Sequence, residues 1–99
     1  MSDTVHRYVL AYDVSSDARR VRVAKTLESY GDRLQFSVFL VDIKLARMVR
    51  LKTTVAGQLD RSTDSLLVCD LGPLVAGENS RIEFIGSTRS FTTHGPLIL

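Results

Sequence analysis

Two aspartates, Asp13 and Asp17, lie where an apolar segment over residues 8–12 gives way to polar residues. The apolar segment predicts a largely buried strand, and ligand and metal sites gather where such a strand ends and the next helix begins. Carboxylate oxygens at this junction can bind a hard cation such as Mg²⁺. One carboxylate is too few for a firm Mg²⁺ site, but a two-fold axis would bring two copies of Asp13 together, and a bridging cation would relieve their repulsion. The alternative is that Asp13 is a strand-end acid hydrogen-bonded to the amide groups of the following helix.

Other residue types offer little chemistry at a recognisable spacing. The sequence contains no glycine-rich phosphate loop, no Cys and His metal spacing and no nucleophile elbow. His6 and His94 are expected to be ordinary surface imidazoles, and Ser15 and Ser16 to be helix caps rather than nucleophiles. The single cysteine, Cys69, excludes an internal disulfide, and its apolar neighbours predict a small buried side chain.

Length, composition and charge indicate one ordinary globular domain. The chain has 99 residues, of which 44% are hydrophobic and 24% charged, and a net charge of +2. No apolar stretch approaches the roughly 18 residues that span a bilayer, and the N-terminus lacks the layout of a signal peptide, so we expect a cytoplasmic protein. Basic side chains form two groups, which could line a phosphate backbone or be solvated helix faces. The groups are Arg19, Arg20, Arg22 and Lys25, and Arg47, Arg50 and Lys52.

The pattern of apolar residues predicts alternating strands and helices. Apolar positions at helical spacing predict a helix over about 17–30, capped by Ser15, Ser16 or Asp17 and ended by a left-handed Gly31. Residues 33–43 predict a closely spaced strand pair, or one strand interrupted by a bulge, and residues 65–71 predict a further strand. A second amphipathic helix is expected over about 44–59. Its apolar stripe consists of Leu45, Met48, Val49, Val55 and Leu59.

This order of elements predicts an α+β fold of the ferredoxin-like type, β-α-β-β-α-β, with two helices on one face of the sheet. We expect a single domain over 1–99, with a core over about 5–72 and a C-terminal extension over about 73–99. The extension contains a short alternating segment, 81–86, and a segment without helical period, 90–99. Such a tail commonly adds a strand to a sheet edge, its own or a partner's, and a homodimer is the simplest partner.

Several segments, taken together, resemble the CRISPR-associated protein 2 family, the small subunit of spacer acquisition. They are residues 12–17, residues 19–24, Leu27, residues 30–31 and above all 33–39, which read Arg-Leu-Gln-Phe-Ser-Val-Phe. The resemblance covers residues 7 to 72 and implies a role in CRISPR adaptation, an antiviral defence. It also implies a ferredoxin-like homodimer in which a C-terminal strand is exchanged between the subunits. A family of toxin-like RNA-cleaving proteins has the same fold, but the match over 37–39 favours the CRISPR family.

The resemblance implies a metal-dependent endonuclease that acts on RNA or DNA. Asp13 takes the role of the catalytic residue and Mg²⁺ ligand, placed at the dimer interface. Further positions match residues that the family associates with nucleic acid or with the active-site surface, and Arg19 and Lys25 are plausible contacts to the phosphate backbone. The matching positions are Tyr12, Arg20, Arg22, Arg33 and Phe39. For two of them another interpretation stays open, because Phe39 could belong to the core or the dimer interface and Tyr12 could pack under the first helix.

A second function of another class also follows from the resemblance. The dimer would be a non-catalytic scaffold that bridges two dimers of the integrase subunit, CRISPR-associated protein 1, while its basic surface holds prespacer DNA. The C-terminal extension would then matter more than Asp13, because strand addition by residues in 82–85 or 96–99 could bind the larger partner.

Overall fold

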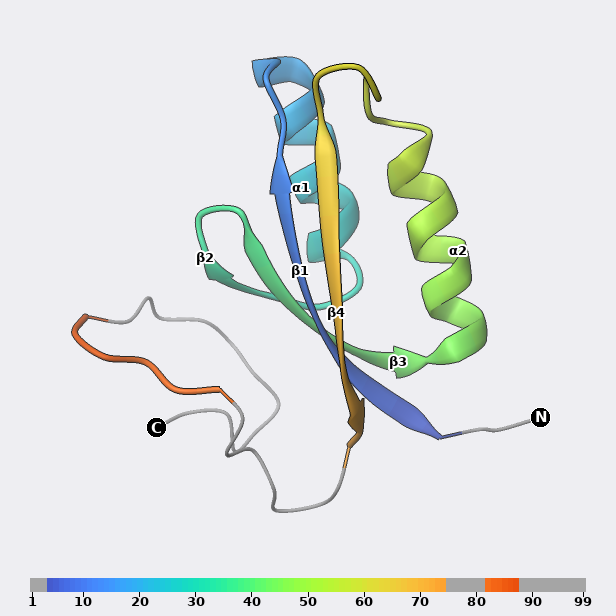
Figure 1. The fold of residues 1–99 in the computed structure, drawn as a ribbon, viewed down its shortest axis with the longest axis vertical. Helices are drawn as coiled ribbons and strands as arrows, with labels where there is room; N and C mark the ends of the chain where they lie inside the picture. The colour runs from blue at the N-terminus through green and yellow to red at the C-terminus, as the bar shows by residue number, and fades with distance from the viewer. Residues whose placement is uncertain (1–3, 75–81, 88–99) are drawn as a thin grey trace.

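The computed structural model describes residues 4–74 and 82–87, and the chain forms one antiparallel sheet and two helices. Its elements are β1 (Val5–Asp13), α1 (Asp17–Glu28), β2 (Asp32–Gln35), β3 (Val38–Lys44), α2 (Leu45–Ala56) and β4 (Ser65–Pro73). The strand order in the sheet is β2-β3-β1-β4, and both helices lie on one face of it (Figure 1). The predicted α+β, ferredoxin-like fold is therefore confirmed.

The central strand β1 positions the core because its side chains alternate between the two faces of the sheet. Tyr8, Leu10 and Tyr12 are buried on the face that the helices cover. They pack against buried apolar side chains of β3 and both helices. Those side chains are Val23, Ala24, Leu27, Phe39, Val41, Ile43, Met48, Leu51 and Val55. Burying a Leu or Val side chain contributes about 1.5–3 kcal/mol, so this cluster holds β1, and with it Asp13, rigidly in place.

Residues 33–43 form two strands rather than one bulged strand. β2 and β3 are antiparallel neighbours joined by a tight turn at Phe36 and Ser37. The pairing shifts register between Arg33 and Gln35, so an irregularity lies beside the turn as well. Figure 1 shows this hairpin alongside the C-terminal half of β1.

Helix α1 follows the prediction at its start and departs from it at its end. Ser16 is the N-cap, and its side chain accepts a hydrogen bond from Arg19 N. The helix ends at Glu28, and Gly31 does not have the positive φ that a left-handed stop requires. A Cβ at Gly31 would instead collide with the carbonyl oxygen of Leu40, so the glycine is needed for close packing against β3.

The buried face of α2 differs from the predicted stripe. Met48, Leu51 and Val55 are buried, whereas Leu45 and Val49 are 58% and 53% exposed. The helix begins directly after β3, and that junction turns the stripe spaced i, i+3 and i+7 toward the sheet. The prediction for Leu45 and Val49 was therefore wrong.

The second face of the sheet, which no helix covers, carries the alternate side chains of β1 and β4. Cys69 lies opposite Val9 on this face and is exposed, so the predicted burial of Cys69 was wrong. The apolar run around it could not reveal that alternation places Cys69 away from the helices. No helix in the described part of the chain is long and apolar enough to cross a membrane.

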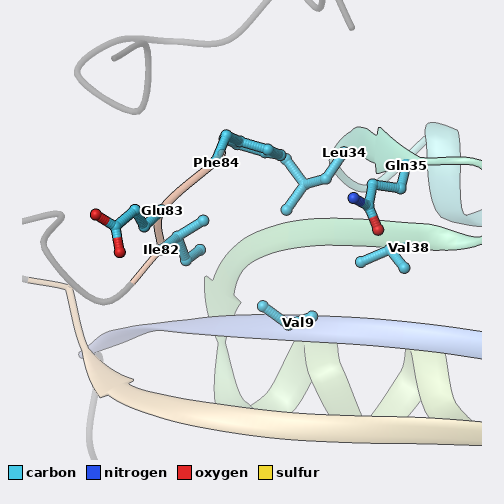
Figure 2. Close-up of a pocket in the computed structure, with 7 residues that line it drawn as sticks. All are labelled: Val9, Leu34, Gln35, Val38, Ile82, Glu83 and Phe84. Carbon is cyan, nitrogen blue, oxygen red and sulfur yellow. The ribbon is translucent and has the colours of Figure 1, made fainter. Parts of the chain in front are cut away.

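Ile82 and Phe84 pack on part of this second face, against Leu34 and Leu40. They leave a groove of about 280 Å³ between segment 82–84, β1 and the β2–β3 hairpin (Figure 2). Residues 82–87 form neither helix nor strand in the single chain. Most of the predicted C-terminal extension, including segment 90–99, lies outside the described residues.

Candidate functional site

Asp13 is the last residue of β1, and its side chain is exposed on the face that the helices leave open. It lies opposite Ser65, the first residue of β4. On the other side, Tyr12 N donates to Ser37 O at 3.1 Å, so the β2–β3 turn adjoins the same strand end. Within the described residues the Asp13 carboxylate has no hydrogen-bond or ion-pair partner. It does not cap α1, because Ser16 does so, and its oxygens are available to a cation.

The other carboxylates near this strand end are already bound. Asp17 pairs with Arg20, and Asp64 is buried among donors from three segments. Asp64 accepts hydrogen bonds from Ser15 N at 3.1 Å and Asp60 N at 2.9 Å, as well as from Arg19. The Arg19 guanidinium is the largest cause that holds the pKa of Asp64 well below its usual range, and these backbone donors lower the pKa further. Asp64 therefore stabilises the loop beside the site and is not a spare metal ligand.

A Mg²⁺ ion is compatible with the donors at Asp13. Mg²⁺ usually keeps several waters and binds one or two carboxylates together with substrate phosphates. In one described chain no group of three or more His, Cys, Asp or Glu side chains is placed to hold a metal ion. A single chain thus offers the one unpaired carboxylate of Asp13 at this end of the sheet, and a second carboxylate would have to come from another copy.

The three arginines on α1 that were predicted to contact nucleic acid differ in whether they are already bound within the protein. Arg19 is bound to Asp64, and Arg20 donates to the Asp17 carboxylate and to the Val14 carbonyl. Arg22 is exposed and has no ion-pair partner among the described residues. Of the three, Arg22 is free to meet a phosphate, Arg20 could do so by exchanging a surface partner, and Arg19 has a structural role.

Tyr12, Arg33 and Phe39 come together on the helix-covered side of the hairpin. The Tyr12 and Phe39 rings stack with centroids 6.3 Å apart. The Arg33 guanidinium lies 5.1 Å from the Phe39 ring centroid and donates to Tyr12 Oη at 3.4 Å. Phe39 is 0% exposed and Tyr12 is 6% exposed. Neither ring has a free face for a base in this chain, so the open alternative, that Phe39 and Tyr12 are packing residues, describes their placement here.

Phe36 is an exposed aromatic residue that the sequence analysis did not select. It is 66% exposed at the β2–β3 turn, and the Arg33 guanidinium lies over its ring, 6.0 Å from the centroid. The sequence feature that could have pointed to Phe36 is the Gln-Phe-Ser-Val-Phe run. With a turn between the two phenylalanines, Phe39 faces the core from β3 and Phe36 is exposed at the turn. The sequence left open a strand pair or one bulged strand over 33–43, and so it did not place a turn at Phe36.

A polar cluster at the opposite end of the sheet is separate from this site. His6 Nδ1 and the Asp70 carboxylate lie 2.9 Å apart, and Gly72 N donates to the same carboxylate at 2.7 Å. The hydrogen bond with His6 is the largest cause that lowers the pKa of Asp70. This contact ties the start of β1 to the end of β4.

Comparisons with known proteins identify the family. The family model described as CRISPR associated protein Cas2 matches residues 6–73. CRISPR-associated endoribonuclease Cas2 3 of Rhodospirillum rubrum is 40% identical over 96 residues, which cover 92% of this chain and 98% of the relative. CRISPR-associated endoribonuclease Cas2 4 of the same organism is 36% identical over 95 residues, which cover 96% of this chain and 74% of the relative.

Solved structures agree with the sequence relatives. A hypothetical protein from Thermus thermophilus superimposes with a TM-score of 0.72 at 30% identity, covering 89% of this chain and 99% of that one. Streptococcus pyogenes Cas2 gives a TM-score of 0.67 at 29% identity, covering 81% of this chain and 99% of that one. The chain therefore belongs to the CRISPR-associated protein Cas2 family, and this membership supports a role in CRISPR adaptation.

Proposed function

We propose that two copies of this chain form a homodimer that binds prespacer DNA or RNA and cleaves phosphodiester bonds, with Mg²⁺ held between the paired Asp13 carboxylates. The observation that carries the proposal is the exposed Asp13 carboxylate, which has no partner among the described residues although the neighbouring Asp17 and Asp64 do. The curated relatives bear the name endoribonuclease, which favours a nuclease over other activities.

An exposed leucine beside Asp13 supports the homodimer. Leu67 is 63% exposed on the face that no helix covers and lies opposite Ala11, two residues before Asp13 on β1. Exposed apolar side chains of this size favour burial against a partner. In an isologous interface the same patch of both subunits meets, so a two-fold axis near Leu67 would bring the two Asp13 side chains toward each other.

Asp13 and Arg22 have different roles in the proposed cleavage. The two Asp13 carboxylates hold the cation, and Arg22 neutralises a phosphate of the bound strand. The hairpin turn and the loop held by Asp64 flank the strand end that carries Asp13, through hydrogen bonds at the neighbouring Tyr12 and Ser15. When bound, Mg²⁺ supplies a Lewis acid that polarises a phosphate oxygen and makes a water molecule more acidic.

A cleavage assay with purified protein tests the proposal. Wild-type protein should cleave single-stranded RNA, single-stranded DNA or duplex DNA with Mg²⁺ present and should not cleave them with EDTA. Asp13→Ala and Asp13→Asn should abolish cleavage while size-exclusion chromatography shows an unchanged dimer. If the wild-type protein cleaves no more than these variants, the nuclease proposal is wrong.

The non-catalytic scaffold is the second candidate function, and the edge of the sheet favours it. β4 is an edge strand of the described sheet, and its solvent-facing groups can accept a further strand. Ile82 and Phe84 already pack on the sheet against Leu34 and Leu40, so the C-terminal extension lies close to the sheet at this point. In this function the dimer bridges integrase-subunit dimers and holds prespacer DNA, and Asp13 is not needed.

Two measurements separate the scaffold from the nuclease. Spacer acquisition that is unchanged in Asp13→Ala would assign the biological role to the scaffold. Removal of residues 86–99 should impair binding to the integrase subunit, because it removes chain that could pair at a sheet edge. Full binding by the truncated protein would contradict this use of the C-terminal extension.

A further inference from the structure

Phe36 stands out because a large aromatic ring is rarely left this exposed at a turn. Its side chain is 66% exposed, whereas the two aromatic residues nearest to it in the site, Tyr12 and Phe39, are buried. The β2–β3 turn that carries Phe36 is held firmly. Tyr12 N donates to Ser37 O at 3.1 Å, and Tyr12 Oη donates to Phe36 O at 3.5 Å. The backbone that carries the exposed ring is therefore held to β1 by these two hydrogen bonds.

Arg33 supports the ring from one side. Its guanidinium lies over the Phe36 ring at 6.0 Å and over the Phe39 ring at 5.1 Å. The same guanidinium contacts Tyr12 Oη at 3.4 Å and the Glu28 carboxylate at 3.6 Å. Arg33 Nε is buried and has no hydrogen-bond partner among the described residues. The cation thus lies against the Phe36 ring, and the ring stays 66% exposed.

The position of the Phe36 ring relative to Asp13 indicates which kind of molecule contacts the ring. Tyr12, the residue before Asp13, makes both hydrogen bonds that hold the turn. The turn that carries Phe36 therefore adjoins the strand end that carries Asp13, and a nucleic acid strand bound at this end of the sheet can reach the Phe36 ring. Every base has a flat face that can stack on an aromatic ring, but a base within a continuous duplex is covered on both faces by its neighbours.

We propose that Phe36, backed by Arg33, is the stacking platform for one unpaired base of the bound strand. The proposal rests on the proposed function, since it needs nucleic acid at this end of the sheet. It gives the site a preference for single strands or frayed ends over continuous duplex, a preference that phosphate contacts by arginines cannot create.

The absence of tryptophan from the sequence makes a direct test possible. Phe36→Trp creates the sole tryptophan, whose fluorescence should be quenched when an unpaired base stacks on it. The titration uses full-length protein, Ca²⁺ in place of Mg²⁺ to keep a cation at Asp13 while preventing cleavage, and either a single-stranded oligonucleotide or its blunt duplex. The single strand should quench the indole and the blunt duplex should not. Val49→Trp, on the exposed face of α2, is the matched control and should respond to neither.

Truncation of the ring gives the second readout. Phe36→Ala should weaken binding of the single strand by roughly 5- to 150-fold, the range expected for loss of one base stacked on an aromatic ring. Phe36→Leu should weaken binding of the single strand similarly, because an apolar side chain without a ring cannot stack. Phe36→Tyr keeps the ring and should bind the single strand as tightly as wild type. Binding of blunt duplex should be unchanged in all three variants.

The outcomes distinguish this proposal from the proposed function. If wild-type protein binds the single strand but Phe36→Ala binds it equally well and the indole of the Phe36→Trp variant is not quenched, the stacking platform is overturned and nucleic acid binding stands. If Phe36→Ala weakens single strand and duplex equally, or changes the oligomeric state, Phe36 has another role and the proposal fails. If wild-type protein binds neither nucleic acid, both proposals fail.

Discussion

Arg19 Nε donates to Asp64 Oδ2 at 2.7 Å, and Arg19 Nη2 donates to Oδ1 of the same carboxylate at 3.3 Å. The pair joins the first turn of α1 to the loop before β4, across 45 positions of the sequence. Asp64 also accepts hydrogen bonds from the backbone of Ser15 and Asp60. Arg19 was predicted as a contact to the phosphate backbone, but its guanidinium instead fixes the loop that adjoins Asp13.

Replacement of Asp64 should destabilise the protein in a pH-dependent way. The pKa of Asp64 is lowered in the folded state, chiefly by Arg19, so its contribution to stability is present above the ordinary carboxyl pKa of about 4 and is lost as the pH falls below it. Asp64→Asn should unfold at a lower temperature than wild type at pH 7. The difference between the two proteins should shrink between pH 4 and pH 2 in thermal melts followed by circular dichroism. An equal difference at every pH would contradict the charge-based explanation.

Gly31→Ala should destabilise the fold by about 1–3 kcal/mol, because the added methyl group collides with the backbone of Leu40 and cannot be accommodated by a side-chain movement. Gly57→Ala at the end of α2 is the matched control. A Cβ there would lie 3.5 Å from Thr54 O, an ordinary contact, so the substitution should be neutral or slightly stabilising. Urea unfolding of the two variants measures the difference, and equal midpoints would refute the close approach of Gly31 to β3.

Leu67→Glu should dissociate the proposed dimer without unfolding the subunit. The substitution places a charge at the exposed apolar position that faces the partner in the proposed dimer, and we expect the dissociation constant of the dimer to rise by at least about tenfold. Val49→Glu, at a position of α2 that is 53% exposed, should leave the dimer intact. Analytical ultracentrifugation compares the two. A Leu67→Glu protein that remains dimeric at the wild-type concentration range would place the interface elsewhere.

Arg22→Ala should weaken nucleic acid binding uniformly across sequences. Removal of one phosphate contact lowers the salt slope of the affinity by about 1. Arg50→Ala on α2 removes the same charge from the other basic group, which the proposal does not use, and should leave the slope unchanged. Fluorescence anisotropy at several salt concentrations measures both. Equal slopes for wild type and Arg22→Ala would remove Arg22 from the interface.

Patterns within one element predicted much of the fold. The buried face of α1 and the order of strands and helices followed from periodicity, because the spacing of Val23, Ala24 and Leu27 allows one buried face. The buried face of α2 did not follow from periodicity. Both Val49 and Leu51 fit an apolar stripe, and the junction with β3 decides which of them is buried. The turn at Phe36 and Ser37 lacks the Gly, Asn, Asp or Pro residues that commonly mark a turn.

The sequence predicted where Asp13 lies but not the contacts around it. The place of Asp13 at a strand end was predicted because the end of an apolar strand is visible in a single sequence. The roles of Arg19 and Phe36 depend on contacts between distant segments, namely with Asp64 and Arg33, and no local pattern reveals these. Sequence alone therefore predicts least well whether a side chain is free to bind a ligand or is already bound to another residue of the protein.

The central claim is that two Asp13 carboxylates, one from each subunit, form one cleavage site. Co-expression of differently tagged wild-type and Asp13→Asn chains gives a heterodimer that can be purified by both tags, with the wild-type homodimer as the reference. We predict that the heterodimer cleaves nucleic acid in Mg²⁺ no faster than the Asp13→Asn homodimer, because one carboxylate does not complete the site. Cleavage by the heterodimer at about half the wild-type rate would show that each subunit acts alone and would contradict the account.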